Sequence, residues 1–314
     1  MNTPPPMEPP TGPRTSLAVP PPRTAAEPAP PSNPPPPTEQ TTPPFQPPPP
    51  TGAPAPAGRP ARYRPQRPWW GFGDVILGVP FFLALSIVGF VVGLAITGVD
   101  GLLDMADSSD VTALPLGLLA FSLLFQQLGQ GIWPLIVSRW KGLGPASDWR
   151  LVAKPRDIGI GLGVAVLGLA GAGVAGMVTS SLVGLTDEAA ADNTQFLREA
   201  AGTPWLAAIL FAAVIGAPIT EELFFRGLTL RAIEKRMGST WAIVLSGVIF
   251  TLPHFTSPDL RGTAVLFSSI FVVGLILGAV TVKTDRLAAA IVAHMIFNGI
   301  GAAAALGWLD QFGV

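Results

Sequence analysis

The sequence predicts an all-α protein: a polytopic membrane helix bundle of about seven transmembrane helices with a disordered, proline-rich N-terminal tail. Only 12% of the 314 residues are charged, which is about half the share found in soluble globular domains. The mean hydropathy of the whole chain is +0.48. The prolines are concentrated at one end, with 27 of 36 in residues 1–68. A segment of this composition buries too little apolar surface to offset the entropy lost on ordering.

Residues 1–68 are therefore expected to form a disordered cytoplasmic tail. Its proline runs favour extended polyproline II, which acts as a semi-rigid spacer. A partner that binds the proline-rich motifs is the alternative. Because no apolar core follows the N-terminus, the tail is not expected to act as a signal peptide. After the tail we expect N-terminal transmembrane helices over 69–202, helices with the polar motifs described below over 203–301, and a C-terminal helix end and tail over 302–314.

Seven stretches after the tail are candidates for spans, which need about 20 apolar residues each. The fourth and fifth are short or interrupted by polar residues, which is tolerated where the polar groups face protein or a water-filled cavity. Three glycine pairs with GxxxG spacing are expected to let helices approach closely: Gly89/Gly93, Gly159/Gly163 and Gly274/Gly278. The spans are Val75–Thr97, Ala113–Val137, Ile158–Leu182, Trp205–Pro218, Trp241–Leu252, Ala264–Val282 and Ala288–Trp308.

Lysine and arginine are distributed unequally between the two sides of these spans. Next to the spans, the alternate segments 59–67, 139–156, 226–236 and 283–286 hold fifteen of them, whereas the opposite segments hold only Arg198 and Arg261. Because cytoplasmic loops carry the excess of positive charge, the N-terminus is predicted to be cytoplasmic and the C-terminus outside. We expect an integral protein of a bacterial plasma membrane, surrounded by membrane lipids.

The composition excludes several classes of function. Without cysteine there is no disulfide, thiolate nucleophile or cysteine-ligated metal. A formal net charge of −1 argues against a nucleic-acid partner. The chain also has no HExxH helix, no GxS turn for a serine nucleophile and no pair of Gly-Asp aspartates within spans. If the protein is a hydrolase, the remaining option is an active site made of Glu and His residues.

The few ionisable groups within the apolar segments are concentrated in three motifs. An ionisable residue inside the membrane is costly and by default indicates a functional site. Two imidazoles and a carboxylate also form an open ligand set of the kind that binds Zn²⁺. The motif residues are Glu221, Glu222 and Arg226 after Pro218, His254 after Pro253, and His294 with Asn298; the two histidines are the only ones in the chain.

Helical spacing relates these residues to one another. Glu222 and Arg226 are four residues apart and share a helix face, as do His294 and Asn298. Glu221 points roughly 100° away from Glu222, so the two carboxylates need not do the same work. Three helices are therefore expected to present these groups to one cavity. Removing a Glu carboxylate from water there would make it a stronger base, as a general base requires.

Structural explanations of each motif stay open at this point. Glu222 and Arg226 are also what a purely structural ion pair requires. His254 beside Pro253 fits a hydrogen-bonded residue at a helix kink, and His294 with Asn298 fits polar contacts between helices. The occurrence of both histidines in the motifs favours one shared site, without indicating its reaction.

The three motifs in this order resemble the CAAX prenyl protease and bacteriocin-processing (CPBP) family of intramembrane proteases. The resemblance covers about Thr203–Gly301 and rests on Glu221-Glu222-x-x-x-Arg226, Phe250-x-x-x-His254 and His294-x-x-x-Asn298. It implies that Glu221 activates the attacking water and that His254 holds this water or a metal. His294 and Asn298 would contribute to an oxyanion site or to metal binding, and Glu222 with Arg226 would order the first motif.

The function expected from motifs and resemblance together is an intramembrane endopeptidase. Its substrate would be a peptide or a lipidated peptide in a cavity that faces the cytoplasm. The site would be either glutamate-dependent and metal-free or a Zn²⁺ site formed by Glu221, His254 and His294. An ion-coupled transporter that uses the cluster as a proton relay, or a non-catalytic membrane scaffold, are the alternatives.

Overall fold

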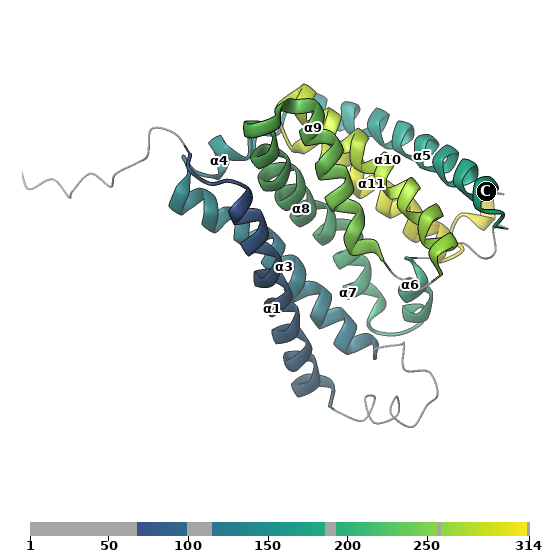
Figure 1. The fold of residues 1–314 in the computed structure, drawn as a ribbon. Helices are drawn as coiled ribbons and strands as arrows, with labels where there is room; N and C mark the ends of the chain where they lie inside the picture. The colour runs from purple at the N-terminus through teal and green to yellow at the C-terminus, as the bar shows by residue number, and fades with distance from the viewer. Residues whose placement is uncertain (1–67, 99–114, 186–192, 256–258, 313–314) are drawn as a thin grey trace, which may run out of the picture. The chain divides into compact units, whose positions relative to one another are not determined.

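The computed structural model describes residues 68–98, 115–185, 193–255 and 259–312, and every regular element in these ranges is a helix. The predicted disordered tail lies, apart from Pro68, outside the described residues. So does the start of the second predicted span, at residues 113 and 114. The all-α class is confirmed for the described part of the chain (Figure 1).

The long helices follow the predicted apolar segments, and short helices lie between them. Two stretches, η2 and η3, are π-helices, in which the hydrogen bonds run from residue i to i+5 and widen the turn. The elements are α1 Phe72–Thr97, α3 Leu116–Lys141, α4 Pro145–Asp148, α5 Arg156–Val183, α6 Gln195–Ala200, α7 Leu206–Phe211, η2 Ala212–Gly216, α8 Ala217–Glu221, η3 Glu222–Leu230, α9 Arg231–Thr251, η4 Leu252–His254, α10 Leu260–Thr284, α11 Ala288–Ala305 and η5 Asp310–Phe312.

Five helical stretches of the described chain are long and apolar enough to cross a membrane. Helix α3 is not among them although it has 26 residues, because Gln126, Gln127 and Gln130 interrupt its apolar sequence. The count of seven spans therefore stays a prediction. The five stretches are Phe72–Thr97, Arg156–Val183, Leu206–His254, Leu260–Thr284 and Ala288–Ala305.

The stretch Leu206–His254 is too long for one crossing. Its 49 residues would extend roughly 74 Å at 1.5 Å per residue, whereas the apolar core of a bilayer is about 30 Å thick. The helix is broken at Gly238, whose φ of 77° and ψ of 171° are not helical. Because glycine has no Cβ, it adopts this positive φ without strain. The chain reverses there, and α9 runs back beside η3 (Figure 1).

The helices pack in two groups of neighbours. Helix α1 lies along α3, and α10 packs against α5, α9 and α11 (Figure 1). The predicted close approaches are present at two of the three glycine pairs: a Cβ on Gly89 would lie 2.4 Å from a backbone oxygen of α3, and one on Gly274 would lie 3.1 Å from Gly247. The Gly159/Gly163 prediction is wrong within the described residues, since a Cβ at either position would meet nothing within 4 Å.

A buried ion pair fixes the start of α11. The Arg286 guanidinium, in the α10–α11 turn, donates to both carboxylate oxygens of Asp157 at the start of α5. The Asp157 side chain is 2% exposed and that of Arg286 10% exposed. This pair holds the α10–α11 turn against α5, and so determines where α11 places the side chains that follow.

Candidate active site

The six predicted site residues lie on three neighbouring parts of the bundle. Glu221 ends α8, and Glu222 and Arg226 lie in η3. His254 ends the short helix η4. His294 and Asn298 lie in α11.

The helix that carries the two glutamates is widened on both sides of α8, and Glu222 is the first residue of the second widened stretch. The π-helix η2 precedes α8, and the π-helix η3 follows it. Pro218 has no N–H, so the i→i+5 donor to the Ala213 carbonyl is missing. The Asn298 amide takes its place, with Nδ2 donating to the Ala213 oxygen at 2.8 Å. A π-helical turn inside an α-helix often marks a functional site.

The two adjacent carboxylates face different surroundings. The Glu222 side chain is 0% exposed, whereas that of Glu221 is 19% exposed. This difference follows from their angular separation of roughly 100° on the helix. The Glu221 carboxylate is therefore the one that water or a substrate can reach.

Glu222 is the centre of a buried polar group. Its Oε1 accepts from Arg226 Nη1 at 2.9 Å and lies 3.0 Å from His294 Nδ1. Arg226 is fully buried as well; its Nη2 donates to the Gly274 carbonyl at 3.3 Å, and its guanidinium lies 4.1 Å from the centre of the Phe250 ring. The charge of Glu222 is thus balanced inside the bundle rather than exposed to a substrate.

His294 connects this buried group to Glu221. Because the Glu222 carboxylate accepts a hydrogen bond, Nδ1 of a neutral His294 carries the hydrogen and Nε2 carries the lone pair. Nε2 lies 3.8 Å from Glu221 Oε2. At this separation one water molecule can donate hydrogen bonds to both atoms.

His254 is oriented by its own helix. Its Nδ1 lies 3.1 Å from the Phe250 carbonyl. In a 3₁₀ turn this carbonyl would accept from the residue three positions later, but that residue is Pro253, which has no N–H. Since a carbonyl only accepts, Nδ1 carries the hydrogen and Nε2 is left with the lone pair. The Phe250 ring lies 5.3 Å from the His254 ring and 5.7 Å from the His294 ring, centre to centre, so both imidazoles border the same aromatic side chain.

Direct contacts therefore join four of the six predicted residues: Glu221, Glu222, Arg226 and His294. Within the described ranges, the side-chain hydrogen bonds of His254 and Asn298 go to backbone carbonyls and not to either carboxylate. These contacts fit the structural explanations given above, a hydrogen-bonded residue at a helix kink for His254 and a polar contact between helices for Asn298. A catalytic role for the two residues stays a prediction.

The arrangement of donors bears on the predicted zinc site. In both histidines Nδ1 donates a hydrogen bond, to the Phe250 carbonyl in His254 and to Glu222 in His294. An imidazole that binds a metal is usually oriented by a hydrogen bond of this kind from its other nitrogen. However, in the part of the chain that the structure describes, no three His, Asp or Glu side chains converge closely enough to hold a metal ion.

One polar residue near the site was not singled out from the sequence. Gln127 of α3 donates from Nε2 to the Ala212 carbonyl in η2 at 3.0 Å. The sequence contained a signal for it, because an amide side chain within an apolar span is costly unless it is bonded.

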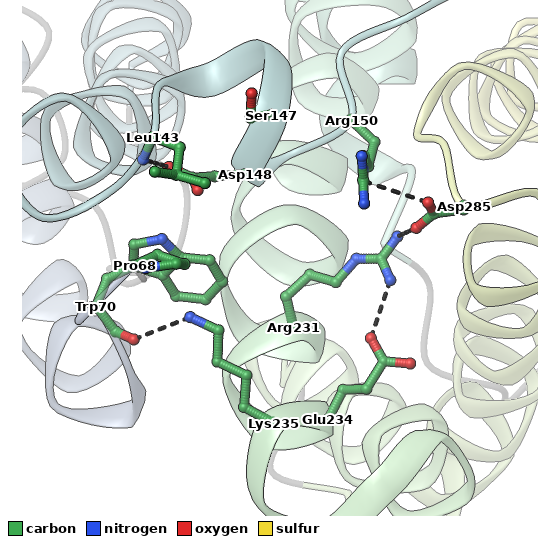
Figure 2. A pocket seen from close by; sticks show the side chains of 10 residues that line it. All are labelled: Pro68, Trp70, Leu143, Ser147, Asp148, Arg150, Arg231, Glu234, Lys235 and Asp285. Carbon is green, nitrogen blue, oxygen red and sulfur yellow. Dashed lines mark hydrogen bonds and ion pairs between the residues drawn. The ribbon is translucent and has the colours of Figure 1, made fainter. Parts of the chain in front are cut away.

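A cavity of about 310 Å³ lies elsewhere, where the segment that precedes α1, helix α4 and the first turns of α9 meet (Figure 2). Arg231 in its wall pairs with Asp285 at 2.8 Å and with Glu234 at 2.9 Å, whereas Lys235 donates to the Trp70 carbonyl at 3.2 Å. None of the six predicted site residues lines it, so the predicted chemistry is not located there. Its lining consists of Pro68, Trp70, Leu143, Ser147, Asp148, Arg150, Arg231, Glu234, Lys235 and Asp285.

Part of the chain matches a known protein family. Residues 203–300 match the family described as type II CAAX prenyl endopeptidase Rce1-like. This segment contains all six predicted site residues, and the match confirms the resemblance drawn from the three motifs. No curated protein and no solved structure matches the chain.

Proposed function

Because residues 203–300 belong to the type II CAAX prenyl endopeptidase Rce1-like family, we propose that this membrane protein is an intramembrane endopeptidase in which Glu221 activates water. The observation that carries the proposal is the distance of 3.8 Å between Glu221 Oε2 and His294 Nε2. A water between these atoms donates one hydrogen to the carboxylate and the other to the imidazole. Its oxygen then presents a lone pair to a substrate carbonyl.

The proposed reaction is hydrolysis of an amide bond. Glu221 accepts a proton from the water as the oxygen attacks the carbonyl carbon, and a tetrahedral oxyanion forms. The C–N bond then breaks, and Glu221 returns the proton to the leaving amine. A well-placed donor to the oxyanion supplies about 3–4 kcal/mol of transition-state stabilisation.

The other residues have separate parts in this proposal. Glu222, balanced by Arg226, holds the hydrogen on His294 Nδ1 and leaves Nε2 free to accept from the water. Asn298 has a second amide hydrogen besides the one bonded to Ala213, and it is the proposed oxyanion donor. His254 borders the same Phe250 ring as His294, and its Nε2 lone pair is available to accept a further hydrogen bond.

We further propose seven crossings with the N-terminus in the cytoplasm and the C-terminus outside. The stretch Leu206–His254 contributes two crossings because it reverses at Gly238. Helix α3, with 26 residues, contributes one more, so that the five apolar stretches become seven. The fifteen-to-two distribution of Lys and Arg supports the orientation.

The proposed substrate is a peptide, with a lipidated C-terminus as the form that the family name implies. The first test is hydrolysis by purified protein of two quenched peptides, one ending in S-farnesylcysteine followed by three residues and one with unmodified cysteine. Glu221→Gln keeps the shape of the side chain but removes the base, so it is expected to abolish cleavage while the protein remains folded. Full activity of this variant would contradict the proposed mechanism. Cleavage of the lipidated peptide alone would identify the substrate class.

A further inference from the structure

We propose that Gln127, in α3 and outside the family segment 203–300, is a positioning residue that keeps the Glu221 carboxylate in register with His294. The inference rests on the proposed function, because register matters only if the two groups share a water. It concerns a helix that contributes none of the six predicted site residues.

The Gln127 amide contacts both the first and the last residue of the π-helix η2. Nε2 donates to the carbonyl of Ala212, the first residue of η2, and this carbonyl also accepts from the Ala217 N–H. At the other end, a Cβ on Gly216 would lie 2.3 Å from Gln127 Oε1. The absence of a side chain at Gly216 therefore makes room for this amide.

One helical turn further along, the same two faces meet again. Gly131 follows Gln127 by four residues, and Thr220 follows Gly216 by four. A Cβ on Gly131 would lie 3.0 Å from Thr220 Cγ2. Thr220 directly precedes Glu221, so the face of α3 that contains Gln127 and Gly131 lies along the helix that ends in the carboxylate.

The hydrogen bond from Gln127 to Ala212 affects the direction in which Glu221 points, because η2 is a π-helix. A π turn contains about one residue more than an α turn, and one residue corresponds to roughly 100° of rotation. Two side-chain amides bond to successive carbonyls of η2, Gln127 to Ala212 and Asn298 to Ala213. If η2 relaxed toward an α-helix, Glu221 would turn away from His294, and their distance of 3.8 Å would be lost.

The main test compares Gln127→Met with Gln126→Met. Both glutamines are half-buried neighbours in α3, but within the described residues no hydrogen bond of the Gln126 side chain is found. We expect Gln127→Met to lower kcat 10- to 100-fold, since small displacements of catalytic groups have effects of this size. We expect KM to stay within twofold, and the pH dependence of kcat to shift because the environment of Glu221 changes. Gln126→Met is expected to leave all three within twofold.

A second test uses the steric contact with Gly216. Gly216→Ala is expected to lower kcat at least tenfold in the native background, because the added methyl displaces the Gln127 amide. After Gln127→Ala the same change should cost less than threefold, since the obstacle is gone. This cycle carries the test if Gln127→Met does not fold.

The outcomes separate this inference from the proposed function. If the native protein shows no Glu221-dependent hydrolysis of either quenched peptide, both are wrong. If the native protein is active and Gln127→Met behaves like Gln126→Met, only the part given to Gln127 is wrong. An equal loss from Gly216→Ala in both backgrounds would likewise overturn the inference alone.

Discussion

Replacing Arg226 by leucine removes the guanidinium that lies 2.9 Å from the Glu222 carboxylate while both side chains are 0% exposed. The variant keeps a buried anion with His294 as its remaining close partner. Breaking a buried ion pair by removing one partner costs about 3–5 kcal/mol, because the other charge stays without compensation.

The structure places the expected cost near the lower end of that range. The contact is a single one, from Nη1 to Oε1, and among the described residues Glu222 Oε2 and Arg226 Nε are buried without a hydrogen-bond partner. Loss of the contact with the Phe250 ring, 4.1 Å from the guanidinium, adds about 1 kcal/mol. We therefore expect the free energy of unfolding to fall by about 3–4 kcal/mol in Arg226→Leu.

The assay is unfolding of the purified protein by SDS in mixed micelles. Arg236→Leu is the matched control, because this exposed arginine in α9 is expected to change stability by less than about 0.5 kcal/mol. Adding Glu222→Gln to Arg226→Leu removes both charges and keeps an acceptor for His294, so at least half of the lost stability should return. If Arg226→Leu is no less stable than Arg236→Leu, or if the double variant is less stable than the single one, the reasoning from buried charge is wrong.

Three further outcomes are expected. Single alanine changes at His254 and His294 should each remove most activity, and their combination should cost little more, since residues that act as a unit are non-additive; modest, additive losses would support separate structural contacts instead. A chelator followed by Zn²⁺ should abolish and then restore hydrolysis if Glu221 and the histidines bind metal, and activity in the chelator would exclude that branch. The change Pro30→Cys introduces the only cysteine of the chain, and an impermeant thiol reagent should label it only after the membrane is opened; labelling of intact cells would overturn the proposed orientation.

The relations that the sequence determined are those set by one helix alone. Period and spacing place Glu222 and Arg226 on one face, turn Glu221 away from Glu222, and put His254 one turn after Phe250. The structure contains each of these as a contact or a difference in exposure. Helical geometry fixes such neighbours whatever the rest of the fold does.

The contacts between helices were decided only by the tertiary structure. Sequence spacing did not indicate that His294 meets Glu222, that Asn298 bonds to the Ala213 carbonyl, or that Gln127 bonds to η2. The two π-helical stretches are also hidden from periodicity, because a wider turn depends on what satisfies its carbonyls from outside.

Packing likewise decided which glycines matter. Gly159 and Gly163 have the spacing of a contact face, yet it is Gly161 between them that approaches another helix, since a Cβ there would lie 2.6 Å from Val292. A motif shows that a close approach is sterically permitted, but the rotation of the helix about its axis selects the face that is used. That rotation is set by long-range contacts such as the pair of Arg286 and Asp157, which lie 129 residues apart in the chain.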